Sequence, residues 1–205
     1  MNELLVSCQS SAEAHAVIER ALGHLFAGHG GALAVQRGAG GMLDTVARWG
    51  GSEVCVATFA LEDCWGLRLG RPHDAHQPAA PTCQHGTPAA HGMACLPLSV
   101  QGETLGLLML RPAPDAPADE RHRLNHLLGV VGEAVKFGLS NLKLREALHI
   151  AALRDALTGL FNRRYLEETL PRELDRTGRT GKPTALAVID LDHFKRFNDG
   201  YGHEA

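Results

Sequence analysis

Hydrophobic residues follow different periods in successive segments of the chain. Residues 11–28 carry apolar side chains three or four positions apart, which predicts an amphipathic helix. Residues 31–37 and 42–49 flank a glycine-rich turn, as the two strands of a hairpin do. Residues 93–100 and 103–111 are apolar runs joined by two residues, and they predict a second hairpin. The pattern therefore indicates an α+β domain in which a helix precedes antiparallel strands.

A long helix is predicted from about residue 119 to residue 153. Its apolar or small residues recur in alternating steps of four and three: Leu124, Leu128, Val131, Val135, Gly138 and Leu142. The stripe then restarts at Leu144 and Leu148, a phase slip of the kind called a stutter. About 35 helical residues extend about 50 Å, too far for one small domain to cover, so we expect the stripe to pair with a second copy. The alternative is a helix that packs on its own sheet, because the repeat lasts barely three heptads.

Composition and charge narrow the class of protein. The chain has 205 residues, of which 44% are hydrophobic and 21% charged, a balance typical of globular domains. The formal net charge of −3 predicts binding neither to nucleic acid nor to an anionic membrane. No run approaches the roughly 20 apolar residues of a membrane span, and the N-terminus has no signal-peptide pattern. Five cysteines, an odd number at irregular spacing, argue against a disulfide framework and favour a cytoplasmic location.

The C-terminal segment ends in a pattern that suits a metal and phosphate site. Residues 184–189 are apolar or small and predict a buried strand, and Asp190 and Asp192 follow it directly. Carboxylates at the C-terminal end of a buried strand lie where α/β-type sheets place their ligands, and hard oxygen donors suit Mg²⁺. The alternative is a strand followed by a capped helix, with the acids in its first turn.

Two long motifs carry a family resemblance in this segment. Residues 155–170 (DALTGLFNRRYLEETL) and 188–205 (VIDLDHFKRFNDGYGHEA) resemble the first half of a GGDEF domain, the diguanylate cyclase family. The resemblance implies a mixed sheet with helices on both faces. It also implies conversion of two GTP into cyclic di-GMP across a homodimer.

The resemblance also assigns roles to single residues. It implies that Asp190 and the backbone carbonyl of Leu191 ligate Mg²⁺, and that Lys195 makes a phosphate or transition-state contact. Asn198 matches the guanine-binding asparagine, and His203 matches a histidine close to the nucleotide.

The GGDEF signature itself, which would supply the second metal-binding carboxylate, is not among the 205 residues. We therefore expect this polypeptide to lack cyclase activity, because phosphoryl transfer depends on metal and donor placement. We also expect its C-terminal strand and helix to bury too little apolar surface to fold alone.

The N-terminal part resembles a GAF domain, a small-molecule sensor fold. The resemblance covers residues 1–140 and rests on the hairpin 93–110, on the glycine-terminated helix with its proline at 66–72, and on the first and last helices. It implies an antiparallel sheet of five or six strands, with helices on one face and a ligand pocket on the other.

Cysteine and histidine residues cluster in this N-terminal part. Cys64, His73, Cys83 and His85 form the pattern C-x8-H-x9-C-x-H, and two thiolates with two imidazoles suit tetrahedral Zn²⁺ or another soft-ligand metal. A haem is a further possibility that the GAF resemblance leaves open. His76, His91 and Cys95 are substitute ligands. The alternatives are a cysteine buried for packing beside a solvated histidine-rich loop, and a Cys64–Cys83 redox pair. Cys8 and Cys55 are interpreted as structural.

Together these patterns predict a cytoplasmic signalling protein of three parts. Residues 1–118 form a GAF-type sensor, residues 119–153 a signalling and dimerisation helix, and residues 154–205 the N-terminal part of a GGDEF domain. The expected partners are a second copy, GTP, and an unknown small-molecule or metal signal. One alternative is a ligand-free GAF module that only dimerises. Another is an enzyme centred on the Cys/His loop, although no nucleophile there is paired with an oriented base.

Overall fold

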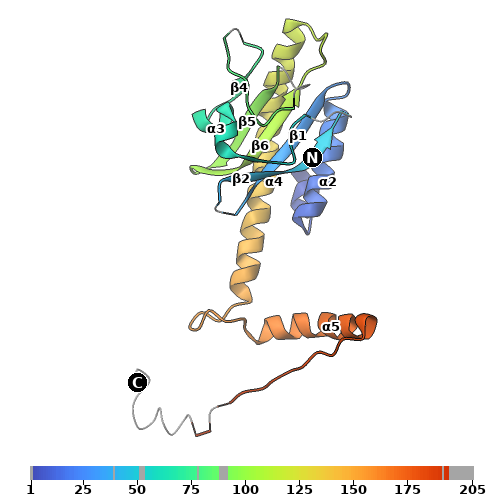
Figure 1. Ribbon diagram of the computed structural model, residues 1–205, viewed down its shortest axis with the longest axis vertical. Helices are drawn as coiled ribbons and strands as arrows, with labels where there is room; N and C mark the ends of the chain where they lie inside the picture. Colours follow the sequence, from blue (N-terminus) through green and yellow to red (C-terminus); the bar gives the residue numbers. More distant parts are fainter. Residues whose placement is uncertain are drawn as a thin grey trace. The chain divides into compact units, whose positions relative to one another are not determined.

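The computed structural model describes residues 2–38, 40–50, 54–77, 79–87, 92–190 and 192–193 (Figure 1). The chain divides into two compact units, residues 1–148 and residues 149–205. No helix in the described part of the chain is both long enough and apolar enough to cross a membrane.

One six-stranded antiparallel sheet forms the centre of the first unit. Its strands are β1 (Gly30–Arg37), β2 (Met42–Trp49), β3 (Thr58–Ala60), β4 (His73–Asp74), β5 (Ala94–Val100) and β6 (Glu103–Arg111). Their order in the sheet is β3-β2-β1-β6-β5-β4. Both predicted hairpins are present, as β1–β2 and β5–β6. The turn of the second hairpin has left-handed backbone at Gln101 (φ 51°) and Gly102 (φ 83°), as two-residue hairpin turns require.

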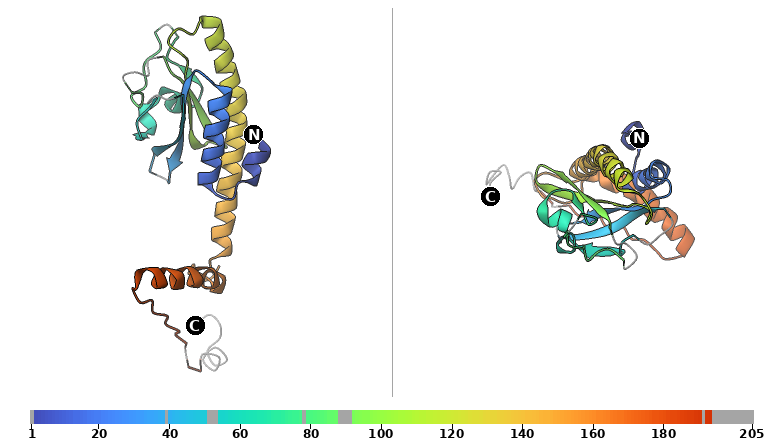
Figure 2. Two further views of the ribbon diagram at one scale, coloured as in Figure 1. Left: turned by 90° about the vertical axis from the view of Figure 1, so that its right-hand side faces the viewer. Right: turned by 90° about the horizontal axis from the view of Figure 1, so that it is seen from above.

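Helices lie on both faces of this sheet (Figure 2). They are α1 (Asn2–Ser7), α2 (Ser11–Leu25), the 3-10 turn η1 (Leu61–Asp63), α3 (Trp65–Leu69) and α4 (Ala118–Ala152). α2 and α4 lie side by side on one face, and α3 lies on the other (Figure 2). Successive strand residues point into two separate cores, because side chains alternate across a strand. In β6, Leu108 joins the core under α2 and α4, whereas Leu107 and Met109 join what we call the α3-side core. The α+β fold class predicted from the sequence is confirmed.

Local signals explain where the shorter helices begin and end. The Ser10 hydroxyl accepts a hydrogen bond from the Glu13 N–H at 3.2 Å and so caps α2. α3 ends at Gly70, whose left-handed backbone (φ 63°) is the conformation that a C-terminal glycine supplies. The sequence predicted this stop.

The predicted dimer stripe of α4 packs instead on its own domain, which corrects the expectation. Its members Leu124, Leu128, Val131, Val135, Gly138 and Leu142 are all buried in the single chain. The five leucine and valine residues belong to the core under α2 and α4. Gly138 is small because a Cβ there would lie 2.8 Å from Leu5 Cδ1 of α1. The stripe therefore fits the alternative interpretation, in which the long helix packs on its own sheet.

A different face of α4 exposes a second apolar row, which we call the outer stripe: Val130, Phe137, Leu144 and Leu148. These side chains are between 56% and 62% exposed. The first three follow one another at seven-residue intervals, so they lie on one helix face. Leu144 and Leu148 therefore belong to this stripe, and the stutter inferred from the sequence is wrong.

Among its described residues, the second unit contains a loop that follows α4 and then the helix α5 (Arg163–Thr180). Asp155 Oδ1 accepts hydrogen bonds from the backbone N–H and the hydroxyl of Thr158, at 2.9 and 2.8 Å, and these bonds lower the pKa of Asp155. Asn162 caps α5 by accepting the Tyr165 N–H at 3.2 Å. α5 therefore begins directly after a side-chain cap.

The strand predicted at 184–189 is absent from the structure. Residues 182–190 are in neither helix nor strand, and the side chains of Val188 and Ile189 are 89% and 91% exposed. A strand needs neighbours that satisfy its backbone N–H and C=O groups. No described residue pairs with this segment as a strand, so its apolar pattern alone does not order it.

A candidate metal centre in the α3-side core

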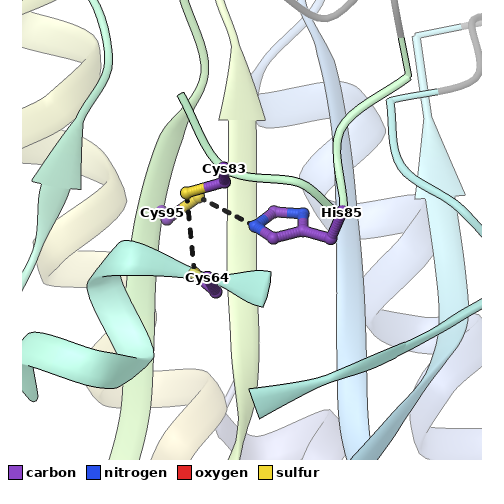
Figure 3. A group of neighbouring side chains, drawn as sticks. All are labelled: Cys64, Cys83, His85 and Cys95. Carbon is purple, nitrogen blue, oxygen red and sulfur yellow. Dashed lines mark hydrogen bonds between the residues drawn. The ribbon is translucent and has the colours of Figure 1, made fainter. Parts of the chain in front are cut away.

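Four side chains from three separate segments meet on the α3 side of the sheet (Figure 3). Cys64 is the N-cap residue of α3, Cys83 and His85 belong to the connection between β4 and β5, and Cys95 lies in β5. Figure 3 shows the three sulfur atoms and the imidazole ring pointing toward one another. We call these four residues the Cys3His cluster.

The donor atoms of the Cys3His cluster lie close enough to share one ion. One ligand atom from each residue lies within 4.8 Å of all the others. Cys83 Sγ lies 4.0 Å from Cys64 Sγ, and Cys95 Sγ lies 3.6 Å from His85 Nε2. All four side chains are buried, with exposed fractions of 0%, 8%, 1% and 1% for Cys64, Cys83, His85 and Cys95.

Backbone hydrogen bonds hold the segment that carries Cys83 and His85. The Gln84 N–H donates to the Asp63 carbonyl at 2.8 Å, and the His85 carbonyl accepts the Val56 N–H at 3.1 Å. The imidazole of His85 stacks on Phe59, with ring centroids 4.6 Å apart. His85 Nδ1 is buried, and it finds no hydrogen-bond partner among the described residues.

Hydrogen bonds among the sulfur atoms lower the pKa of one cysteine and raise the pKa values of the other two. The hydrogen bonds that Cys83 makes with Cys64 and Cys95, with smaller contributions from His85 and the Trp65 N–H, hold the pKa of Cys83 far below its usual value. The hydrogen bond with Cys83 raises the pKa of Cys64 to about 12. Hydrogen bonds with Cys64 and Cys83, together with burial, raise the pKa of Cys95 well above its usual value.

The structure brings together three of the four ligands predicted from the sequence and leaves His73 outside the group. Cys64, Cys83 and His85 converge, and Cys95 takes the fourth position. His73 Nε2 instead hydrogen-bonds the carbonyl of Pro81 at 2.8 Å, so it braces the same loop. Of the other substitute ligands, His76 lies beside Asp74, with 3.4 Å between His76 Nδ1 and Asp74 Oδ1. His91 lies outside the described residues.

Of the residues predicted to serve the cyclase chemistry, the structure describes only Asp190. Asp190 lies in the exposed segment outside any strand. Leu191, Lys195, Asn198 and His203 lie outside the described residues. No cluster of potential ligands forms around Asp190 among the residues that the structure describes.

A cavity of about 470 Å³ lies at the edge of the sheet, between β4, β5 and the N-terminal part of α4. Its polar lining includes Asp74, Arg121 and Asn125. Asn125 Nδ2 donates to Asp74 Oδ2 at 2.7 Å, whereas Asn125 Oδ1 is buried and without a partner in the described part. The volume falls within the range of small-molecule sites. The GAF resemblance implied a pocket on the face away from the helices, whereas this particular cavity is lined in part by α4.

The C-terminal segment matches a known catalytic family. Residues 152–205 match the family described as diguanylate cyclase, GGDEF domain. Diguanylate cyclase DgcP of Pseudomonas aeruginosa is 56% identical over 54 residues, which are 26% of this chain and 8% of that protein. Diguanylate cyclase DgcS of Shewanella oneidensis is 41% identical over 66 residues, 32% of this chain and 22% of that protein. The chain thus spans less than a quarter of the length of these relatives.

Solved structures resemble the first unit in fold. A GAF domain of A. aeolicus nlh2 in an inactive state matches with a TM-score of 0.52 and 16% identity. The match covers 70% of this chain and 91% of that solved chain. A methyl-accepting chemotaxis protein fragment matches with a TM-score of 0.55 and 13% identity, over 71% of this chain and 98% of the fragment. Free methionine-R-sulfoxide reductase of Neisseria meningitidis, in complex with its substrate, has a TM-score of 0.52 at 10% identity, with coverage of 70% and 86%. The chain therefore combines a GAF-type fold with a segment, residues 152–205, that matches the diguanylate cyclase GGDEF family.

Proposed function

We propose that this chain is a signal-transduction protein in which a GAF-type sensor domain controls a diguanylate cyclase domain. The observation that carries the proposal is the continuity of α4. This helix packs residues 124–142 into the core of the GAF-type fold and continues to Ala152, where the match to the GGDEF family begins. A helix shared by two domains transmits small shifts in packing from one to the other.

The proposed reaction joins two GTP molecules into one cyclic di-GMP and releases two pyrophosphates. Mg²⁺ would neutralise developing phosphate charge, as in phosphoryl transfer generally. We propose Asp190 and the Leu191 carbonyl as its ligands, Lys195 as the phosphate contact, and Asn198 and His203 as nucleotide contacts. These roles rest on the motif resemblance in residues 188–205.

We propose that two copies associate through the outer stripe of α4. The apolar residues of this stripe recur at heptad spacing, which is the pattern of a two-stranded coiled coil. Asn141 lies on the same helix face between Phe137 and Leu144 and is half-buried. One polar residue within an apolar seam fixes the register of a coiled coil and favours a pair of parallel helices. Parallel pairing would bring two GTP-binding domains to the same end of the dimer.

An activity assay tests the cyclase assignment. We expect the 205-residue polypeptide to form no cyclic di-GMP from GTP and Mg²⁺, because phosphoryl transfer depends on the placement of metal and donor. A fusion that continues the chain with the remaining GGDEF sequence of the P. aeruginosa relative is expected to form it. Asp190→Asn should abolish that activity, whereas Asp175→Asn, an exposed carboxylate of α5, should not. Product from the 205 residues alone would refute the inactivity, and a silent fusion would refute the cyclase assignment.

A second candidate function is dimerisation without ligand binding or cyclase control. The outer stripe favours it, because an exposed apolar row on a helix is an association surface whatever lies downstream. A fusion that dimerises but whose activity is independent of the GAF-type domain would support this alternative.

A further inference from the structure

We propose that Cys64, Cys83, His85 and Cys95 bind one Zn²⁺ ion in a closed tetrahedral site. The proposal rests on the arrangement of these side chains and is independent of cyclase activity. Their donor atoms come from α3, from the β4–β5 connection and from β5, and they converge within 4.8 Å of one another. Hydrophobic packing buries cysteines, but it does not require three sulfurs and an imidazole nitrogen to face one point.

Two of the six donor-atom separations agree with the edges of a zinc tetrahedron, and all six are within 4.8 Å. Zn–S bonds of about 2.3 Å and Zn–N bonds of about 2.0–2.1 Å place two sulfurs about 3.8 Å apart, and a sulfur and a nitrogen about 3.6 Å apart. Cys64 Sγ and Cys83 Sγ are separated by 4.0 Å, and Cys95 Sγ and His85 Nε2 by 3.6 Å. An ion can therefore enter with small movements of the side chains.

The surroundings of the cluster favour a bound cation. The α3-side core is apolar, and an anionic sulfur buried there is costly unless a positive charge compensates it. The Trp65 N–H donates to Cys83 Sγ at 3.3 Å, the type of outer contact that orients a metal-bound thiolate. Phe59 fixes the plane of the His85 ring by stacking. On binding, Zn²⁺ would displace the thiol protons of the three cysteines, and these protons would pass to solvent.

Other uses of the cluster account for fewer of its members. A disulfide would join two sulfurs and leave the third sulfur and the imidazole unexplained, and all five cysteines are free. A catalytic zinc needs an open coordination position, whereas four protein donors fill a tetrahedron. The ion would therefore act as a clamp that joins α3, the β4–β5 connection and β5.

Metal analysis of the 205-residue protein tests the site. The protein should be purified without a polyhistidine tag, stripped with a chelator under reducing conditions, and titrated with Zn²⁺ and with Co²⁺. We expect one equivalent of either ion, with a thiolate-to-cobalt charge-transfer band and the d–d bands of tetrahedral Co²⁺. Cys64→Ser and Cys95→Ser should weaken Co²⁺ binding by at least about 100-fold, since even outer-shell losses cost 10- to 100-fold.

Matched variants keep the test specific. Cys8→Ser removes a buried thiol from the opposite core and should bind Co²⁺ as the wild type does. His73→Gln should retain one equivalent, because His73 only braces the loop. Circular dichroism identifies variants that do not fold, and chelator stripping followed by metal return in the wild type avoids mutation altogether.

The proposal fails if the stripped, reduced wild type takes up neither ion. It also fails if Cys95→Ser binds like Cys8→Ser, or if the protein isolated without reductant contains a Cys64–Cys83 disulfide and no zinc.

Discussion

Two glycines show how differently single residues constrain the first unit. A Cβ atom on Gly106 would lie 2.2 Å from the carbonyl oxygen of Ala34 in the neighbouring strand β1. The same atom on Gly129 of α4 would have no heavy atom within 4 Å. Gly106 therefore permits close approach of two central strands, whereas Gly129 contributes only backbone freedom.

Alanine substitutions at these two positions should shift stability in opposite directions. Gly106→Ala is expected to lower the free energy of unfolding by about 1–3 kcal/mol, because backbone must move to admit the methyl group. Gly129→Ala should raise it by up to about 1 kcal/mol, because alanine is the better helix former. Denaturant unfolding of both variants measures the difference. A Gly106→Ala protein as stable as the wild type would show that the strands separate without cost.

The ligands of the Cys3His cluster were predictable only in part, for a reason that lies in strand pairing. The sequence identified Cys64, Cys83 and His85, and it named Cys95 only as one of three substitute ligands. In the sheet, His73 and Cys95 are opposite partners of β4 and β5. Spacing along the chain does not encode which of two paired residues reaches the cluster, because this depends on side-chain length and on the path of the loop.

At the scale of elements, α4 has two apolar faces with different partners. The inner face packs on the sheet, and the outer stripe faces solvent in the single chain. The sequence predicted the length of the helix and the periodicity of the inner face. It could not assign that face to its partner, since a heptad-like repeat suits both a sheet and a second helix.

Charge placed in the outer stripe should weaken the proposed dimer. Phe137→Asp puts a carboxylate at an interface that excludes water, so we expect the dissociation constant of the dimer to rise at least about tenfold. Lys143→Asp is the matched control, because Lys143 lies on another face of α4 and contacts Glu103. Sedimentation equilibrium compares the two variants. A monomeric wild type, or equal dissociation constants for both variants, would exclude this face as the dimer interface.

At the scale of the whole molecule, the two units differ in how far local sequence determines structure. The first unit buries two cores and forms the predicted sheet. In the second unit, α5 forms from its own capping signals, whereas residues 184–189 do not form the predicted strand. Helices satisfy their hydrogen bonds locally, but a strand depends on neighbours distant in sequence. Motif resemblance therefore identified the family of this segment more reliably than its hydrophobic pattern identified its secondary structure.

The phase of α4 between the two units provides the test of signal transmission. In a coiled coil with 3.5 residues per turn, seven inserted residues restore the helix phase, whereas four rotate the downstream domain by about 50°. Inserted after Leu148 in the cyclase fusion, four residues should change the rate of cyclic di-GMP formation at least about fivefold, the lower end of typical coupling energies. Seven residues should leave the rate within about twofold, since they preserve the register of the paired helices. Sedimentation must show that both fusions remain dimers, so that a changed rate reports phase and not dissociation. Equal rates for the two insertions would mean that the helix links the domains without conveying their relative rotation.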